Sequence, residues 1–206
     1  MIYLSSFLVL LCSYLIGSIP FGYLVARRYG VDIFKVGSAN PGATNVKRCV
    51  GKGAGNFVFL LDFLKGLVSC GWIYLMPESA LGESAASLGI LGIVGAVLGH
   101  SFSVFTRFRG GKGVSTVLGG VVALIPLTAL IGALVWMILF YATRYVSVAS
   151  IGLAISLPIS QFFFPPMDVR FWFALILAVF VTYRHRENIQ RLLKGKENRF
   201  TDDSSK

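Results

Sequence analysis

The chain has 206 residues, of which 55% are hydrophobic and only 14% charged, and its mean hydropathy is +0.75. This balance excludes an ordinary soluble domain and indicates an integral membrane protein. A formal net charge of +10 could suit a nucleic-acid-binding protein, but in so apolar a chain it indicates basic loops gathered on one side of a membrane. The three cysteines, Cys12, Cys49 and Cys70, are odd in number and lack the spacing of a metal site.

Apolar runs along the chain predict an all-α membrane protein with about seven transmembrane helices. The first run, Ile2 to Val25, is followed by Arg27 and Arg28, the reverse of the charge order in a signal peptide, so we expect a retained helix. Because nearly the whole chain is needed to cross the bilayer, we expect one polytopic catalytic domain over residues 1–200 and a polar tail over residues 201–206. The further apolar runs cover residues 57–76, 86–105, 114–143, 146–164 and 169–183.

The run at residues 114–143 is too long for one span. As a single helix it would measure about 45 Å, against a hydrocarbon core of about 30 Å, and Pro126 lies near its middle. Six Lys or Arg residues lie in residues 26–55, three in 106–113 and seven from Arg184 onward. Two short helices around Pro126 would place all three groups in the cytoplasm, with the N-terminus outside and the C-terminus cytoplasmic. A reentrant segment at 114–126 would give the same parity.

The polar segment VGSANPGATNVKR, Val36 to Arg48, is unlike an ordinary connector. Its Gly, Ser, Asn and Thr residues offer hydroxyls, amides and backbone N–H groups in turn conformations, which suit a polar or anionic ligand. A flexible loop is the alternative interpretation.

A second segment, FRGGKGVST from Phe108 to Thr116, places three glycines around Lys112. Glycines let backbone N–H groups converge on an anion, so the segment predicts a phosphate site, helped by a helix that begins at Val114. It departs from the nucleotide-binding pattern G-x-x-x-x-G-K-[ST], because Gly113 follows Lys112 where Ser or Thr would ligate magnesium. The pattern therefore argues against an ATPase. The alternative interpretation is a basic turn that touches anionic lipid.

The third segment is RHRENIQRLLKGKE, Arg184 to Glu197. On a helix, His185 and Asn188 share a face because they are three residues apart. The alternative is a plain amphipathic helix at the membrane surface.

Three polar residues stand at or within the predicted spans. We expect His100 to cap or hydrogen-bond the end of the third span. Asp62 and Lys65 lie three residues apart in the second span and are too costly to face lipid. We expect them to form a structural ion pair, with a role in the site as the alternative.

Together, GSANPGATNVKR, LGHSFSVFTRFRGGKGVST and RHRENIQRLLKGKE resemble, in order and spacing, the three motifs of the PlsY-type acyl-phosphate:glycerol-3-phosphate acyltransferase family. The resemblance runs from the first helix to about Glu197. It implies an enzyme of the bacterial inner membrane, facing the cytoplasm, that takes part in an early step of phospholipid synthesis. Such an enzyme transfers a fatty acyl group from acyl phosphate to the 1-hydroxyl of sn-glycerol 3-phosphate and releases phosphate and lysophosphatidic acid.

The resemblance also implies partners. They are the two substrates and membrane lipid, with no nucleic acid and no cofactor, and it leaves room for a transient contact with the enzyme that makes acyl phosphate.

The same resemblance assigns the candidate site residues. Ser38 and Arg48 match the essential pair of the first motif, and His185 and Asn188 match the catalytic pair of the third, whereas Glu197 matches a more structural position. In the later turn SVAS, Ala149 interrupts a pair of serines of the family pattern. The substrate-binding candidates are Gly110, Gly111, Lys112, Gly113, Asn45, Ser147 and Ser150.

The expected mechanism depends on positioning, because acyl phosphate is a mixed anhydride that is already activated. Arg48 and Lys112 would neutralise phosphate oxygens, and Ser38 would add a hydrogen bond. Asn188 would hold the attacking hydroxyl or polarise the carbonyl. His185 would act as general base or only orient the site, in which case a donor phosphate oxygen takes the proton.

Two other classes compete with this interpretation. A transporter or channel for a small anion would use basic loops and an interrupted helix, but the sequence lacks internal repeats and keeps its polar motifs at one surface. A purely structural membrane protein would leave the three motifs without a purpose. Acyltransferases with an H-x-x-x-x-D pair are excluded, because neither His100 nor His185 has Asp five residues on.

Overall fold

The computed structural model describes residues 2–76, 85–164 and 168–200, and every regular element in these ranges is a helix. The chain divides into two compact units, Met1–Leu124 (unit 1) and Ile125–Lys206 (unit 2). The predicted tail at 201–206 lies outside the described residues. Five helical segments of the described chain are long and apolar enough to cross a membrane: Tyr3–Arg28, Lys52–Leu75, Ala85–Thr106, Pro126–Thr143 and Val146–Phe163.

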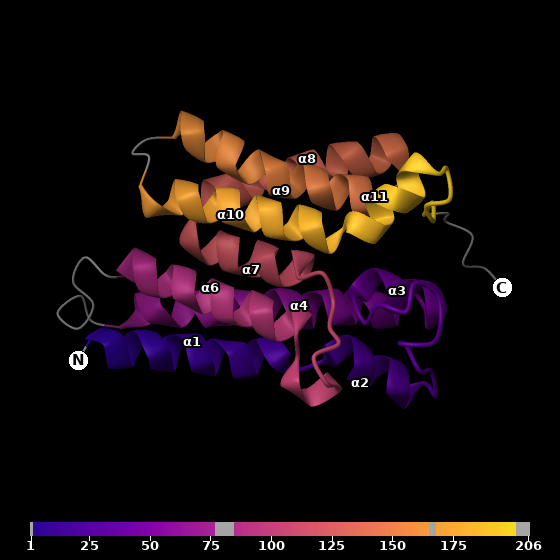
Figure 1. Cartoon of the computed structure of the whole chain (residues 1–206), viewed down its shortest axis with the longest axis horizontal. Helices are drawn as coiled ribbons and strands as arrows, with labels where there is room; N and C mark the ends of the chain where they lie inside the picture. Colours follow the sequence, from indigo (N-terminus) through magenta and orange to yellow (C-terminus); the bar gives the residue numbers. More distant parts are fainter. Residues whose placement is uncertain (1, 77–84, 165–167, 201–206) are drawn as a thin grey trace. The chain divides into compact units, whose positions relative to one another are not determined.

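Unit 1 is a bundle in which α1 packs against α6, and α4 packs against both α6 and α7. Two glycines of α6 allow the first contact: a Cβ on Gly95 would lie 2.5 Å from the Leu10 carbonyl oxygen, and one on Gly99 would lie 2.1 Å from that of Tyr14. Figure 1 shows that α2, α3 and the connection from α6 to α7 lie toward the end of unit 1 opposite the N-terminus. The elements are α1 (Ile2–Ser18), α2 (Phe21–Arg28), α3 (Ala43–Cys49), α4 (Lys52–Gly71), η1 (Trp72–Leu75), α6 (Ala85–Ser101), η3 (Val104–Thr106) and α7 (Val114–Leu124).

The expected continuous first helix is broken near its C-terminal end. Helix α1 ends at Ser18 and α2 begins at Phe21, so the prediction of one helix through Val25 was wrong. Pro20 explains the break, because it has no N–H to donate and disfavours the helical conformation in the residue before it. At the break the Ile19 carbonyl oxygen accepts the Phe21 N–H at 3.1 Å, and the regular helical hydrogen-bond pattern is interrupted.

Unit 2 contains α8 (Pro126–Thr143), α9 (Val146–Phe163), α10 (Val169–Arg184) and α11 (Arg186–Leu193). Helix α9 packs against both α8 and α10. Pro126 occupies the first turn of α8, where its missing N–H costs nothing, and α7 ends two residues earlier at Leu124. The predicted division of the long apolar run at Pro126 is therefore confirmed. The prediction of seven spans and their orientation stays a prediction.

The distribution of side chains suits a lipid environment. Large apolar side chains such as Phe7, Ile138 and Ile176 are more than half exposed, whereas Asp62 and Lys65 are buried. Many large apolar side chains thus face outward while this charged pair is buried, as expected for helices that face hydrocarbon.

We predict that Gly99→Ala lowers the stability of the protein by about 1–3 kcal/mol, because the new methyl group would collide with the backbone of α1. Thermal unfolding in detergent measures the effect. Gly53→Ala is the matched control: Gly53 also lies in a helix, and nothing surrounds the position of its Cβ within 4 Å. Equal loss in the two variants would contradict close packing of α6 on α1.

Candidate functional site

The first motif forms a loop held together by a buried amide. The Ser38 backbone N–H donates to Asn45 Oδ1 at 2.9 Å, and Asn45 Nδ2 donates to the Val36 carbonyl oxygen at 3.1 Å. Gly37 adopts a φ of +58°, and any Cβ there would strike Asn45. Asn45 is only 2% exposed and its contacts position the loop, while its predicted role in substrate binding stays a prediction. Ser38 itself lies exposed on this loop.

Arg48 lies in the last turn of the short helix α3 and is exposed. Its neighbour Lys47 is turned instead toward Asn56, with Nζ and Oδ1 3.3 Å apart. The helix therefore presents one cation to solvent close to the Ser38 loop in sequence.

The second motif runs from η3 to the start of α7. Arg107 and Phe108 have φ values of +55° and +60°, which turn the chain sharply before the glycines. Gly113 has a φ of +84°, and its carbonyl oxygen accepts the Val117 N–H that opens α7. Lys112 is half-buried in this loop. The loop thus leads directly into a helix N-terminus, the arrangement expected of an anion site.

His100 packs against the glycine loop through both its backbone and its ring. The Gly111 N–H donates to the His100 carbonyl oxygen at 3.1 Å. A Cβ on Gly110 would lie 2.1 Å from that same oxygen, and a Cβ on Gly111 would lie 2.2 Å from His100 Nε2. Glycine is required at both positions because any side chain would displace the loop from α6.

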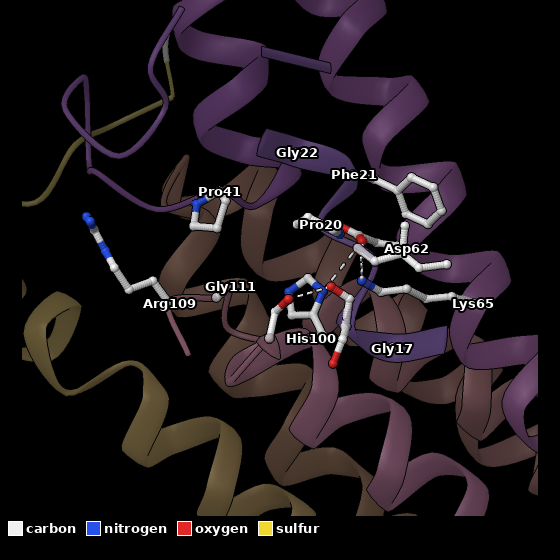
Figure 2. Close-up of a pocket in the computed structure, with 14 residues that line it drawn as sticks. Gly17, Pro20, Phe21, Gly22, Pro41, Asp62, Lys65, His100, Arg109 and Gly111 are labelled. Carbon is white, nitrogen blue, oxygen red and sulfur yellow. Dashed lines mark hydrogen bonds and ion pairs between the residues drawn. The ribbon is translucent and has the colours of Figure 1, made fainter. Parts of the chain in front are cut away.

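The expected ion pair of α4 is present. Lys65 Nζ lies 2.9 Å from Asp62 Oδ1, with both side chains 3% exposed. His100 Nδ1 lies 3.5 Å from the same carboxylate oxygen, a contact that our sequence reasoning missed. Figure 2 shows the three side chains turned toward one another in a small pocket that reaches Pro41 of the first motif and Gly111 of the second.

A stacked pair joins the second motif to Phe34, which lies two residues before the first motif. The Arg109 guanidinium lies over the Phe34 ring, with its carbon 4.5 Å from the ring centroid. In Figure 2, Arg109 points away from His100 and past Pro41. Unit 1 therefore brings together the Ser38 loop and the glycine loop, which lie about seventy residues apart in sequence. No motif pattern signalled the pairing of Phe34 with Arg109.

The third motif lies in unit 2, where Glu197 collects three donors. Ser147 Oγ and Asn188 Nδ2 donate to Oε1 at 2.9 and 2.6 Å, and Arg191 Nε donates to Oε2 at 2.8 Å. Burial favours the neutral acid, but the hydrogen bonds from Asn188, Arg191 and Ser147 outweigh it and lower the pKa of Glu197. The carboxylate is therefore charged, and it fixes Asn188 and Ser147 in place.

His185 stands at the junction of α10 and α11 and is 3% exposed. Its Nδ1 lies 2.8 Å from the Val181 carbonyl oxygen. Only a protonated Nδ1 can donate to that oxygen, so a neutral His185 carries its lone pair on Nε2. The prediction placed His185 and Asn188 on one face of a single helix. In the structure His185 lies at the end of α10, whereas Asn188 lies within α11.

The two serines of the SVAS turn have different partners. Ser147 reaches Glu197, whereas Ser150 Oγ accepts a hydrogen bond from Trp136 Nε1 at 3.4 Å. Both are buried in unit 2. The structure thus brings Ser147 together with Asn188 and turns the Ser150 hydroxyl toward α8.

We predict that Glu197→Gln lowers stability by about 1–2 kcal/mol at neutral pH, because the new amide group cannot accept from all three donors. The charged carboxylate stabilises the fold above its ordinary pKa of about 4.5, and this contribution is lost as the pH falls through the lower pKa of the folded protein. Unfolding measured from neutral pH to below pH 4 checks both statements.

Glu187→Gln is the matched control for this prediction, since Glu187 is an exposed glutamate on α11. The wild type and the Glu187 variant should lose stability in acid more steeply than the Glu197 variant. Parallel pH profiles for all three proteins would count against the role given to Glu197.

Comparison with known proteins places these motifs in a family. The sequence model of the glycerol-3-phosphate acyltransferase family matches residues 7–195. Glycerol-3-phosphate acyltransferases of Aquifex aeolicus and Fusobacterium nucleatum are 44% and 42% identical to the chain, each over 96% of it and over 100% and 99% of their own lengths.

Solved structures agree with the sequence matches. The crystal structure of PlsY (YgiH), an integral membrane glycerol 3-phosphate acyltransferase, in its glycerol 3-phosphate form has a TM-score of 0.86 and 44% identity, covering 96% of both chains. Its lysophosphatidic acid form has a TM-score of 0.83 and 43% identity over the same shares. The all-α membrane fold and the acyltransferase activity expected from the motifs are thereby confirmed: the chain belongs to the glycerol-3-phosphate acyltransferase family.

Proposed function

We propose that this acyltransferase takes its acyl group from a fatty acyl phosphate and transfers it to the 1-hydroxyl of sn-glycerol 3-phosphate, giving lysophosphatidic acid and phosphate. The observation that carries the proposal is the glycine loop, which brings Lys112 to the N-terminus of α7 and lines one pocket together with Pro41 of the first motif in unit 1. A related enzyme that is 44% identical was crystallised in a glycerol 3-phosphate form. The loop therefore suits the phosphate of that substrate.

The residues of unit 1 supply charge. Arg48 is an exposed, planar guanidinium whose N–H donors can pair with two oxygens of a phosphate group, and Lys112 adds a compact charge within the loop. Ser38 contributes a hydroxyl from a loop whose shape Asn45 fixes. If Arg48 and Ser38 contact the phosphate of the acyl donor, that phosphate leaves more easily from the acyl carbon, while Lys112 holds the phosphate of glycerol 3-phosphate.

The residues of unit 2 supply orientation and proton transfer. The bond that forms joins the glycerol oxygen to the acyl carbon, and the bond that breaks joins that carbon to the phosphate oxygen. In this proposal His185, which carries its lone pair on Nε2 when neutral, would accept the hydroxyl proton as a general base. Asn188 Nδ2 donates to Glu197. In this proposal the carbonyl oxygen of the same amide would accept a hydrogen bond from the substrate hydroxyl.

We predict that purified protein releases phosphate from palmitoyl phosphate only when sn-glycerol 3-phosphate is present, with lysophosphatidic acid as the second product. Arg48→Ala should lower kcat/KM by about 100-fold, because a charged contact to phosphate is lost. Lys112→Ala should raise KM for glycerol 3-phosphate. The exposed cation Lys52 provides a matched control, and Lys52→Ala should stay within about twofold of wild type.

Donor and base are tested in the same assay. Palmitoyl-CoA and acyl carrier protein loaded with palmitate replace palmitoyl phosphate in parallel reactions. Turnover with one of these donors, but none with palmitoyl phosphate, would overturn the donor assignment. His185→Ala separates the two proton routes: loss of turnover supports a base, whereas retained turnover supports a donor phosphate oxygen as the proton acceptor.

We also propose that the protein resides in the bacterial inner membrane with its motif loops facing the cytoplasm. Six Lys or Arg residues at 26–55 and three at 106–113 support this orientation. In a variant without Cys12, Cys49 and Cys70, a membrane-impermeant maleimide should label Tyr3→Cys from the periplasm but Lys52→Cys only after the inner membrane is broken. The reverse pattern would invert the proposed topology.

A further inference from the structure

The buried charges of unit 1 belong to none of the groups given a chemical role above. Asp62, Lys65 and His100 are each less than a tenth exposed, and they meet inside an apolar bundle. Charged groups in such a place are expensive and persist only with partners and usually with a purpose. Their arrangement has two anchors, one at the helix break and one at the glycine loop.

The first anchor is the break between α1 and α2. Lys65 Nζ donates to the Ile19 carbonyl oxygen at 3.1 Å, and Ser103 Oγ donates to that of Ser18. The Ile19 carbonyl oxygen also accepts the Phe21 N–H at 3.1 Å, so Lys65 adds a second donor there, whereas Ser103 supplies a side-chain donor to Ser18. Lys65 thus ties α4 to the break, and Asp62 balances its charge.

The second anchor is the glycine loop, which His100 touches on two sides. Its carbonyl oxygen accepts the Gly111 N–H, and its imidazole lies against Gly111 so closely that the three atoms nearest to an added Cβ all belong to the ring, with Nε2 at 2.2 Å. The opposite ring nitrogen, Nδ1, faces Asp62 at 3.5 Å. The ring therefore stands between a fixed charge and the loop.

We propose that His100 is a positioning residue for substrate binding: the Asp62 carboxylate, held by Lys65, fixes the imidazole so that its Nε2 edge supports Gly111 and keeps the glycine loop in the shape that takes the phosphate of glycerol 3-phosphate. The inference rests on the proposed role of that loop. It adds a residue of α6 and a charge pair of α4 to the determinants of affinity, although none of them touches the substrate.

A purely structural role predicts something different. If His100 only fills space, its substitutions lower stability and leave KM unchanged in the protein that remains folded. If it shapes the loop, they raise KM for glycerol 3-phosphate much more than KM for palmitoyl phosphate. The split between the two KM values therefore separates the roles.

Two conservative variants of His100 separate the contribution of Nδ1 from that of Nε2. An Asn side chain places its amide nitrogen near the position of Nδ1 and keeps the contact with Asp62, whereas Gln reaches the position of Nε2. We expect His100→Asn to raise KM for glycerol 3-phosphate at least tenfold with little loss of stability, and His100→Gln to stay within about threefold of the wild-type KM despite lower stability. Ile93→Val, a buried change in the same helix, controls for loss of stability alone and should not alter KM.

A double-mutant cycle gives a second, independent measurement. Gly111→Ala alone should raise KM for glycerol 3-phosphate, because its methyl group meets the ring. In a His100→Ala background the ring is absent and the methyl group has room, so the same change should raise KM little further. Additive effects would show that ring and loop act separately and would overturn the proposal, as would an unchanged KM in His100→Asn.

Lys112→Ala distinguishes failure of this inference from failure of the proposed function. If Lys112→Ala raises KM for glycerol 3-phosphate while His100→Asn and the cycle show no effect, only the positioning role is wrong. If Lys112→Ala leaves that KM unchanged, the glycine loop does not bind the substrate phosphate, and the inference fails with it.

Discussion

The ion pair between Lys65 and Asp62 is the constraint on which unit 1 depends. Pro20 interrupts the regular hydrogen bonding of the first helix inside an apolar bundle, where hydrocarbon cannot supply donors to backbone carbonyls. Lys65 supplies a second donor at Ile19, at the cost of burying a charge that Asp62 must balance. The same carboxylate then meets His100, whose backbone and ring contact the glycine loop. A break in one helix is thereby linked to the shape of a loop more than eighty residues away.

Each unit solves the problem of holding polar groups at a membrane in its own way. Unit 1 uses backbone turns, with glycines at positive φ and buried side chains such as Asn45 that hold the loops from behind. Unit 2 uses one carboxylate, Glu197, as a common acceptor for groups from α9 and α11. The buried side chains of Asn45 and Glu197 both have partners within the protein, whereas Arg48 is an exposed cation that an anionic ligand can reach.

The sequence predicted what depends on local pattern and failed where distant residues meet. Pro126 and the charge distribution were enough to divide the long apolar run, and the spacing of Asp62 and Lys65 was enough to predict their pair. Pro20 carried the same kind of signal as Pro126, but the run from Ile2 to Val25 is short enough to cross the bilayer as one helix, so its length gave no reason to expect a break. The contact of His100 with Asp62 and the stacking of Arg109 on Phe34 join residues thirty-eight and seventy-five positions apart, and no periodicity encodes such distances.

The buried position of Glu197 has a chemical consequence for the reaction. A carboxylate can only accept hydrogen bonds, so it forces Asn188 to present Nδ2 toward it and settles which end of the amide faces the other way. A neutral residue at position 197 would accept or donate and would leave the amide free to turn over. Because the attacking group of glycerol 3-phosphate is a hydroxyl that must lose a proton, an oxygen of Asn188 that accepts from it would aim that hydroxyl, whereas a nitrogen in the same place would compete for its lone pair. The charge on Glu197 thus selects the orientation of Asn188 that the proposed acyl transfer requires.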